Sequence, residues 1–298
     1  MRISTVTMFE QSLNSLNRQQ GEFLKVGQQI ASGRRVVNPS DDPLAASRAV
    51  SVGQSISSVE QFASARVSVR NSLSQGESVL NSVSDSLVRA KTLLVQASSD
   101  TLSPVDRQSV AAELRGLREG LLGQANTTDG NGRYLFGGFK DSAPPFERPN
   151  GSDTITYQGD SNVRVQRVDG FREMPVSDTG DKIFGDIFDT LQTAIEALEA
   201  EGQQVDHESL RESMRKVDAS FDNVLTVRAS MGARLNELDA IDTVAGNRML
   251  SYQQTLSQLV DLDYAEAITE YSLRQVGLQA AQRAYVDVQG LSLFDYLR

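Results

Sequence analysis

Few side chains in this sequence are of the types that perform acid–base, nucleophilic or metal chemistry. The chain has one histidine, His207, and no cysteine. His207 stands between Asp206 and Glu208 near an expected helix start. A catalytic or metal role would need a second histidine or a cysteine as partner, and the sequence offers neither. We therefore interpret His207 as a surface side chain, and we expect no metal and no cofactor.

Two adjacent carboxylates, Asp41 and Asp42, are the next candidates for chemistry. A pair of carboxylates can divide general acid and general base roles. Here they stand directly before Pro43, and an aspartate followed by proline is typical of a helix start, where the carboxylate accepts backbone N–H groups. We therefore expect both to cap a helix.

Two further groups of residues could suggest a site. Gly137 and Gly138 lack the glycine spacing of a phosphate-binding loop, so they indicate a turn or close packing. A hydrolase site is the most distant alternative, and its candidate residues fall in expected turns, where aspartate is common for backbone reasons. They are Asp153, Asp160, Asp169 and Asp178.

Composition excludes several classes of protein. The 298-residue chain has a formal net charge of -10 and a sequence pI of about 4.8, so it lacks the basic surface that binds nucleic acid. No apolar run approaches 18 residues, so we expect no membrane span. The first 16 residues show no apolar core of a signal peptide. Any export is expected to use a route that reads no cleaved signal.

Heptad spacing of apolar residues dominates the first 100 positions. It predicts a first amphipathic helix that ends at Ser32 and Gly33, and a second from Pro43 to about Ser99. A third helix is expected from Ser103, as cap, to about Ala125. The seam of the second helix runs through Phe62, Arg66, Val69, Leu73, Gly76, Leu80, Val83, Leu87, Ala90, Leu94 and Ala97.

The middle of the chain changes character. Residues 133–140 suggest extended backbone, and prolines exclude helix over much of 141–180. Residues 154–157 and 163–165 are expected to be strands on either side of a turn at 159–162. This predicts a small β insertion that rests on the helical body.

Helical periodicity returns at Ile183 and is expected to continue to Gly202. A long seam then runs from Leu210 to Leu259, and it slips by one residue before continuing from Val260 to Val288. Such a slip changes the winding of a coiled coil or marks a domain boundary.

These patterns predict a mainly α fold in which the N- and C-terminal halves form a long antiparallel helical coiled-coil bundle, with the β insertion at its far tip. We expect three parts. Residues 1–40 with 260–298 form a terminal coiled-coil assembly domain, 41–140 with 181–259 a helical middle domain, and 141–180 the β domain. We also expect the terminal parts to be loose in a monomer and to order against neighbouring subunits.

Several motifs resemble those of the bacterial flagellin family. The N-terminal ones are MRIST at 1–5, SGR at 32–34 and NPSDDP at 38–43. The C-terminal ones are VRASMGARLN at 227–236, DLDYAEAI at 261–268 and LSLFDYL at 291–297. Within the family, GRYLFGGF at 132–139 and PPF at 144–146 are similar to the subunits that join the flagellar hook to the filament.

The resemblance implies a structural adaptor at the hook–filament junction, exported by the flagellar type III apparatus to the extracellular flagellum, with no catalysis. It implies as partners a ring of identical subunits, a hook-side junction protein, the flagellin filament and its cap, and an export chaperone. A minor flagellin of the filament itself is the alternative.

From the seams and the matched motifs together we expect an assembly interface without catalytic or metal-binding residues. Its candidate residues are Val6, Phe9, Leu13, Leu16, Phe23, Ile30, Asp41, Asp42, Arg228, Arg234, Asn236, Tyr264, Ile268, Tyr271, Leu278, Tyr285, Leu293 and Leu297.

Overall fold

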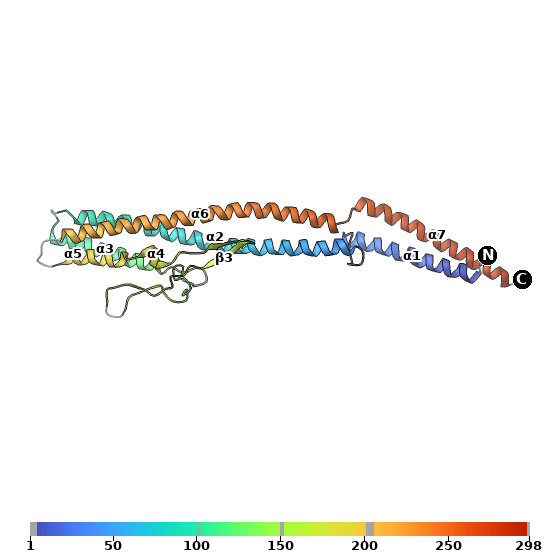
Figure 1. Ribbon diagram of the computed structural model, residues 1–298, viewed down its shortest axis with the longest axis horizontal. Coiled ribbons are helices and arrows are strands. Elements are labelled where there is room, and N and C mark those ends of the chain that lie inside the picture. The colour runs from blue at the N-terminus through green and yellow to red at the C-terminus, as the bar shows by residue number, and fades with distance from the viewer. Residues whose placement is uncertain (1–4, 100–101, 150–151, 201–205, 297–298) are drawn as a thin grey trace. The chain divides into compact units, whose positions relative to one another are not determined.

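The fold is built from long helices contributed by both halves of the chain, as a computed structural model shows (Figure 1). It describes the backbone of residues 5–99, 102–149, 152–200 and 206–296, and the side chains of these ranges from residue 7 to 287. The elements are α1 (Thr5–Ser32), α2 (Pro43–Ala97), α3 (Pro104–Ala125), β1 (Phe146–Glu147), β2 (Thr156–Tyr157), β3 (Val165–Asp169), β4 (Arg172–Pro175), α4 (Gly180–Phe184), α5 (Ile187–Glu199), α6 (His207–Val260) and α7 (Tyr264–Tyr296).

The mainly α prediction, with a small β insertion between helical halves, is confirmed. Helix starts follow the expected chemistry. The hydroxyl of Ser103 accepts the N–H of Asp106, and Pro104 occupies the first helical position of α3. Among the described helices, none is apolar and long enough to cross a membrane.

The chain divides into two compact units. The terminal unit comprises residues 1–58 and 247–298, and the central unit comprises residues 59–246. The three-part division expected from the sequence stays a proposal.

In the terminal unit, α1 and α7 lie side by side (Figure 1). The ring of Phe9 on α1 contacts the ring of Tyr285 on α7. The expected slip in the heptad register coincides with a break between two helices. The helix α6 ends at Val260, and α7 begins at Tyr264 after three residues of non-helical backbone. Asp263 caps α7 by accepting the N–H groups of Ala265 at 2.9 Å and Glu266 at 3.3 Å.

In the central unit, α2 and α6 run antiparallel. Lys91 pairs with Asp218 at 2.6 Å, whereas Arg228 pairs with Glu77 at 2.7 Å, so rising numbers on one helix meet falling numbers on the other. Ten of the eleven expected seam positions of α2 are buried, and only Phe62 is partly exposed. α3 and α5 pack together and complete the core, which includes Leu114, Leu121, Leu191 and Ile195.

The β insertion contains two separate two-stranded sheets, and the expected hairpin between residues 154–157 and 163–165 is wrong. β2 pairs with β1, the strand before it in the chain, and β3 pairs with β4, the strand after it, and both pairs are antiparallel. The first pairing is set by side-chain packing, because Phe146 of β1 is buried against Phe184 and Phe188. Buried aromatic residues of a strand determine its pairing more strongly than a polar turn sequence does.

The expected position of the insertion at the far tip is also wrong. Arg66 of α2 donates to the carbonyl of Val168 at 2.9 Å, and Arg172 donates to Glu237 of α6 at 2.6 Å. The described part of the insertion therefore contacts the sides of both long helices. Arg89 of α2 pairs with Glu113 of α3, so α3 turns back along α2 before the insertion begins.

Two smaller expectations need correction. Residues 133–140 are mostly turn rather than extended, because Gly137 and Gly138 approach neighbouring backbone too closely for a side chain. The returning helix begins earlier than expected, at Gly180, and breaks at Gly185, whose φ is +46°. Its second part, α5, ends at Glu199, and Gly202 lies outside the described residues.

Candidate assembly interface

The terminal helix pair is held by an apolar seam that includes two aromatic contacts. The ring centroids of Phe23 and Tyr271 are 4.7 Å apart, and those of Phe9 and Tyr285 are 5.4 Å apart. Gly27 lies beside the Tyr271 ring, and a Cβ there would be in ordinary van der Waals contact at 3.7 Å. The expected seam residues that are half-buried in this pair are Phe9, Leu13, Leu16, Phe23, Ile30, Tyr271, Leu278 and Tyr285.

A second set of apolar side chains on the same pair faces solvent. Leu273 is 69% exposed and Val276 is 63% exposed, although both are on α7 beside the seam. Tyr264 and Ile268, which the sequence placed in the interface, are 52% and 55% exposed. On α1, Leu24 is 57% exposed. Two helices thus leave apolar surface that a partner can cover.

Three of the expected interface residues have side chains outside the described part of the structure, so they are assigned neither to the seam nor to the exposed surface. Val6 and Leu293 belong to α1 and α7, but their side chains are outside the described residues. Leu297 lies outside the described residues altogether.

The loop between α1 and α2 is tied to the break between α6 and α7, and we call these two segments, residues 33–42 and 259–263, the crossover. The backbone N–H of Arg35 donates to the carbonyl of Val260 at 2.8 Å, and its guanidinium donates to the carbonyl of Leu259 at 2.8 Å. The N–H of Leu262 donates to the carbonyl of Gly33 at 3.1 Å. These bonds fix the register between the end of α1 and the start of α7.

Asp41 and Asp42 stabilise the crossover as ionised carboxylates that accept hydrogen bonds from backbone N–H groups. Asp41 accepts the N–H groups of Asn38 at 2.8 Å and Val37 at 3.2 Å, and Lys25 lies 3.2 Å away. The hydrogen bond from Asn38, with help from Lys25, lowers the pKa of Asp41 below its ordinary value. The carboxylate of Asp41 therefore remains ionised at neutral pH, with one oxygen beside Lys25 and the other accepting the two N–H groups.

Asp42 does the same at the start of α2. It accepts the N–H of Ala45 at 2.9 Å and pairs with Arg35 at 3.2 Å. The hydrogen bond from Ala45, followed by that from Arg35, lowers the pKa of Asp42. The expectation of a helix cap agrees with these contacts for Asp42, which stands directly before α2. It is wrong for Asp41, which accepts the N–H groups of Asn38 and Val37 in the turn before the helix.

Arg228 and Arg234 are engaged within the chain. Arg228 donates to Glu77 at 2.7 Å and to the hydroxyl of Ser84 at 3.3 Å. Arg234 forms a two-pronged pair with Asp178, at 2.9 and 3.3 Å. Asn236 is exposed on α6. A role in subunit contacts stays a prediction for all three.

Sequence reasoning missed one ionic cluster that organises the central unit. Arg66 is 3% exposed, pairs with Asp242 and also holds the β3 backbone at Val168. Arg70 joins the same carboxylate at 2.7 Å. The signal was available, because Arg66 and Asp242 each interrupt an apolar seam, and buried charges on facing seams have to pair.

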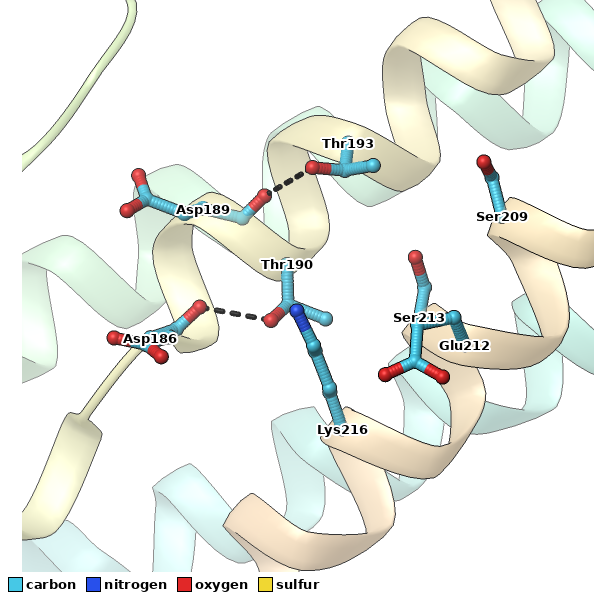
Figure 2. Close-up of a pocket in the computed structure, with 8 residues that line it drawn as sticks. All are labelled: Asp186, Asp189, Thr190, Thr193, Ser209, Glu212, Ser213 and Lys216. Carbon is cyan, nitrogen blue, oxygen red and sulfur yellow. Dashed lines mark hydrogen bonds between the residues drawn. The ribbon is translucent and has the colours of Figure 1, made fainter.

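One pocket in the central unit lies between α5 and α6 and encloses about 360 Å³ (Figure 2). Its two threonine hydroxyls bond to the backbone of their own helix, and the hydroxyl of Ser209 donates to the carboxylate of Asp206 at 2.6 Å. Thr190 donates to the carbonyl of Asp186, and Thr193 donates to that of Asp189. The acidic side chains and Lys216 around it form no nucleophile–base pair. Within the described ranges, no group of three or more His, Cys, Asp or Glu side chains is placed to hold a metal ion.

Comparison with known proteins identifies the helical regions at both ends of the chain. Residues 3–141 match the bacterial flagellin N-terminal helical region, and residues 214–297 match the bacterial flagellin C-terminal helical region. The chain belongs to the bacterial flagellin family, a class of structural subunits of the flagellum.

Within that family, two relatives that match over their full length are named flagellar hook-associated protein 3. The chain is 40% identical over 317 residues to flagellar hook-associated protein 3 of Escherichia coli strain K12, covering 99% of each. It is 39% identical to the protein of the same name in Salmonella typhimurium, covering 100% of each. A flagellin of Listeria innocua is 23% identical, over 94% of this chain and 93% of that protein.

Solved structures share the fold. The crystal structure of Xanthomonas campestris FlgL matches with a TM-score of 0.63 at 21% identity, covering 69% of this chain and 99% of that one. The flagellar junction protein FlgL from Legionella pneumophila matches with a TM-score of 0.62 at 19% identity, covering 72% and 100%.

Proposed function

We propose that this chain is a structural adaptor subunit that joins the flagellar hook to the filament. The observation that carries the proposal is the 40% identity to flagellar hook-associated protein 3 over 99% of both chains. The chain is part of the bacterial flagellum and associates with hook and filament components. A minor flagellin is the second candidate, but the 23% identity to flagellin is much lower.

The geometry supports assembly by helix packing. A half-buried seam fixes α1 against α7, while Leu273, Val276 and Leu24 leave apolar surface on the outside of the pair. Burial of apolar area contributes roughly 25 cal/mol per Å², so covering such residues can drive association without any reaction. We propose no catalytic activity, because the carboxylates singled out from the sequence act as caps and ion-pair partners.

The finer partners follow from this role. Identical copies would form a ring, with a hook-side junction protein on one side and flagellin, assembled under the filament cap, on the other. Before export, a chaperone would cover the C-terminal helix, whose outer apolar residues need shielding. Secretion to the cell exterior would then precede assembly.

Position and copy number in isolated flagella test the proposal against the minor-flagellin alternative. Gold-labelled antibodies against the chain are expected at one place, where the hook meets the filament, at a small and constant number per flagellum. Label spread along the filament would reject the junction role and favour the minor flagellin.

A further inference from the structure

A phenylalanine stands free at the end of the β3–β4 hairpin. The register pairs Asp169 with Arg172, which leaves Gly170 and Phe171 as the turn. The side chain of Phe171 is fully exposed, at 105% of its reference area. By comparison, Val165 of the insertion is 56% exposed, and Phe139, just before the insertion, is 61% exposed. An isolated exposed aromatic of this kind is a candidate contact residue.

The hairpin that carries Phe171 is firmly anchored. Arg172, next to it in the chain, pairs with Glu237 of α6 through two hydrogen bonds of 2.6 and 2.9 Å. Val168 and Met174 are fully buried, and Arg66 holds the carbonyl of Val168 at 2.9 Å. The ring is therefore presented on a fixed support, which lowers the entropy lost when it binds.

A groove elsewhere on the same insertion matches a phenyl ring in size. It lies between α2 and the start of β3 and encloses about 210 Å³. A cavity of about 150 Å³ is known to hold a benzene molecule. Buried Val69 and Leu135 line the groove, and exposed Phe139 and Val165 stand at its edge. One aromatic ring would cover this apolar lining.

The groove also has the charge that an aromatic face attracts. Two guanidinium groups line it, those of Arg133 and Arg164. Each is held in place by a carboxylate, Arg133 by Asp129 at 3.3 Å and Arg164 by Asp141 at 2.8 Å. A guanidinium group that stacks on the face of an aromatic ring attracts it, and it can do so while its edge stays paired with a carboxylate. Asp129 also lines the groove, so the features that favour a ring are its size, its apolar lining and the two guanidinium faces.

The ring cannot fill its own groove. Val165 is at the groove, and Phe171 is six residues further along the hairpin, a distance of roughly 15–20 Å at about 3.3 Å per residue. A ring that enters the groove would therefore come from another molecule. A contact between two different patches of identical chains is head-to-tail, and it generates rings or helices.

We propose that Phe171 of one copy inserts into the groove of a second copy, linking neighbouring subunits in the assembled junction. The inference rests on the proposed function, because it assigns a lateral contact to the subunits of that assembly. It places a specific contact in the β insertion, in addition to the packing of the terminal helices.

Cross-linking tests the contact directly, because the chain has no cysteine of its own. Gly170→Cys puts a thiol beside the ring, where a Cβ meets nothing within 4 Å, and Ser72→Cys puts one in the groove. The two single variants are produced together in a strain that lacks the wild-type protein. Isolated flagella are oxidised, and covalent dimers are measured on a gel.

A dimer is expected from the mixed variants and little from either variant alone, because a head-to-tail contact brings residue 170 of one copy to residue 72 of the next. Adding Phe171→Ala to the Gly170→Cys chain should reduce the dimer at least about tenfold, as for loss of a central contact residue. Filaments that form normally without the mixed dimer would overturn the inference and leave the junction role standing. Absence of the protein from the junction would instead overturn the proposed function.

Two variants without cysteine give an independent measurement. Phe171→Ala removes the ring, and Ser72→Trp fills the groove. Both should lower the shear force at which filaments detach from hooks, with an unchanged melting temperature of the purified monomer. Val105→Ala, which removes a 70% exposed side chain on α3, is the matched control and should behave as wild type. Wild-type detachment in both variants would also overturn the inference.

Discussion

The rings of Phe23 on α1 and Tyr271 on α7 lie with their centroids 4.7 Å apart and their planes at 32°. This contact joins residues from the two ends of the chain, and it is flanked by the half-buried Phe9 and Tyr285. Removing either ring of the central pair should destabilise the terminal helices without unfolding the central unit.

We expect Phe23→Ala to lower the stability of the terminal helix pair by about 1–3 kcal/mol, because a partly buried aromatic contact is lost. Hydrogen exchange of α1 and α7 measures this, with exchange in α2 and α6 as an internal reference. Leu24→Ala is the control, since that side chain is 57% exposed on the same helix. Equal protection in Phe23→Ala and wild type would show that the seam does not hold the pair.

Gly33 is expected to be the most sensitive glycine of the crossover. Its φ is +69°, and a Cβ there would lie 2.9 Å from the hydroxyl of Tyr264. Gly33→Ala should destabilise the terminal unit by about 1–2 kcal/mol through backbone strain alone. Gly21→Ala should have the opposite sign, with a gain of about 0.5–1 kcal/mol, because it lies inside α1 with open space around it. Thermal unfolding of the two variants compares them, and a stable Gly33→Ala would contradict the crossover geometry.

The crossover should weaken in acid. Asp41 and Asp42 both have a pKa lowered by hydrogen bonds from backbone N–H groups, with Lys25 and Arg35 adding to the effect. Because the folded pKa is below the unfolded value of about 3.9, their stabilisation is complete well above that value and is lost as the pH falls through the folded pKa. Protease cleavage near the crossover should therefore increase below about pH 4.

Asparagine variants separate the two aspartates. Asp42→Asn keeps the helix cap, because asparagine also caps helices well, and it loses only an ion pair with Arg35 in which the Asp42 carboxylate is 34% exposed. It should therefore change stability little at pH 7 and flatten the acid dependence. Asp41→Asn should reduce stability more at pH 7, because it loses the ion pair with Lys25 at a carboxylate that is only 14% exposed. An acid dependence that is unchanged in the double variant would assign the effect to other carboxylates.

Arg118 should be the costliest arginine to replace in the central unit. It is 2% exposed, and it donates to the carbonyls of Phe188 and Asp153, which ties the insertion to α3 and α5. Arg118→Met should cost about 1–3 kcal/mol for each carbonyl left unsatisfied. Urea unfolding measures the loss. Arg115→Met is the control, because Arg115 and Glu199 form an exposed pair that contributes at most about 1 kcal/mol. Equal effects of the two replacements would reject the assigned role.

The helices could be predicted from the sequence because their seams repeat over many turns. Leu73, Leu80 and Leu87 recur at heptad spacing and are all buried. Helix ends were equally clear where cap chemistry is local, as at Ser103 and Asp42. These signals depend on neighbours in the chain, so a single sequence contains them.

The strand pairing could not be predicted, because β1 and β2 have two residues each and no visible alternation. Their register depends on Phe146, which packs on Phe184 and Phe188 from a distant helical segment. The contacts of the crossover could not be predicted from the sequence for a similar reason. Arg35 donates to the backbone carbonyls of residues 259 and 260, and every residue type has such a carbonyl, so the sequence does not indicate which one is used.

Of the candidate interface, the aromatic pairing across α1 and α7 could be foreseen from the seams, whereas the pairing of Arg66 with Asp242 was overlooked. Arg66 is one of the expected positions of the α2 seam, and Asp242 lies within the seam from Leu210 to Leu259. Opposite charges on two facing apolar seams predict an ion pair, and here the arginine is 3% exposed and the aspartate 42% exposed.

Deletion of the gene in the source bacterium tests the central claim most directly, with cells viewed by electron microscopy and the medium assayed for flagellin. The account predicts bare hooks and unpolymerised flagellin outside the cell, and recovery of filaments when the wild-type gene is returned. Normal filaments in the deletion strain would contradict the junction role.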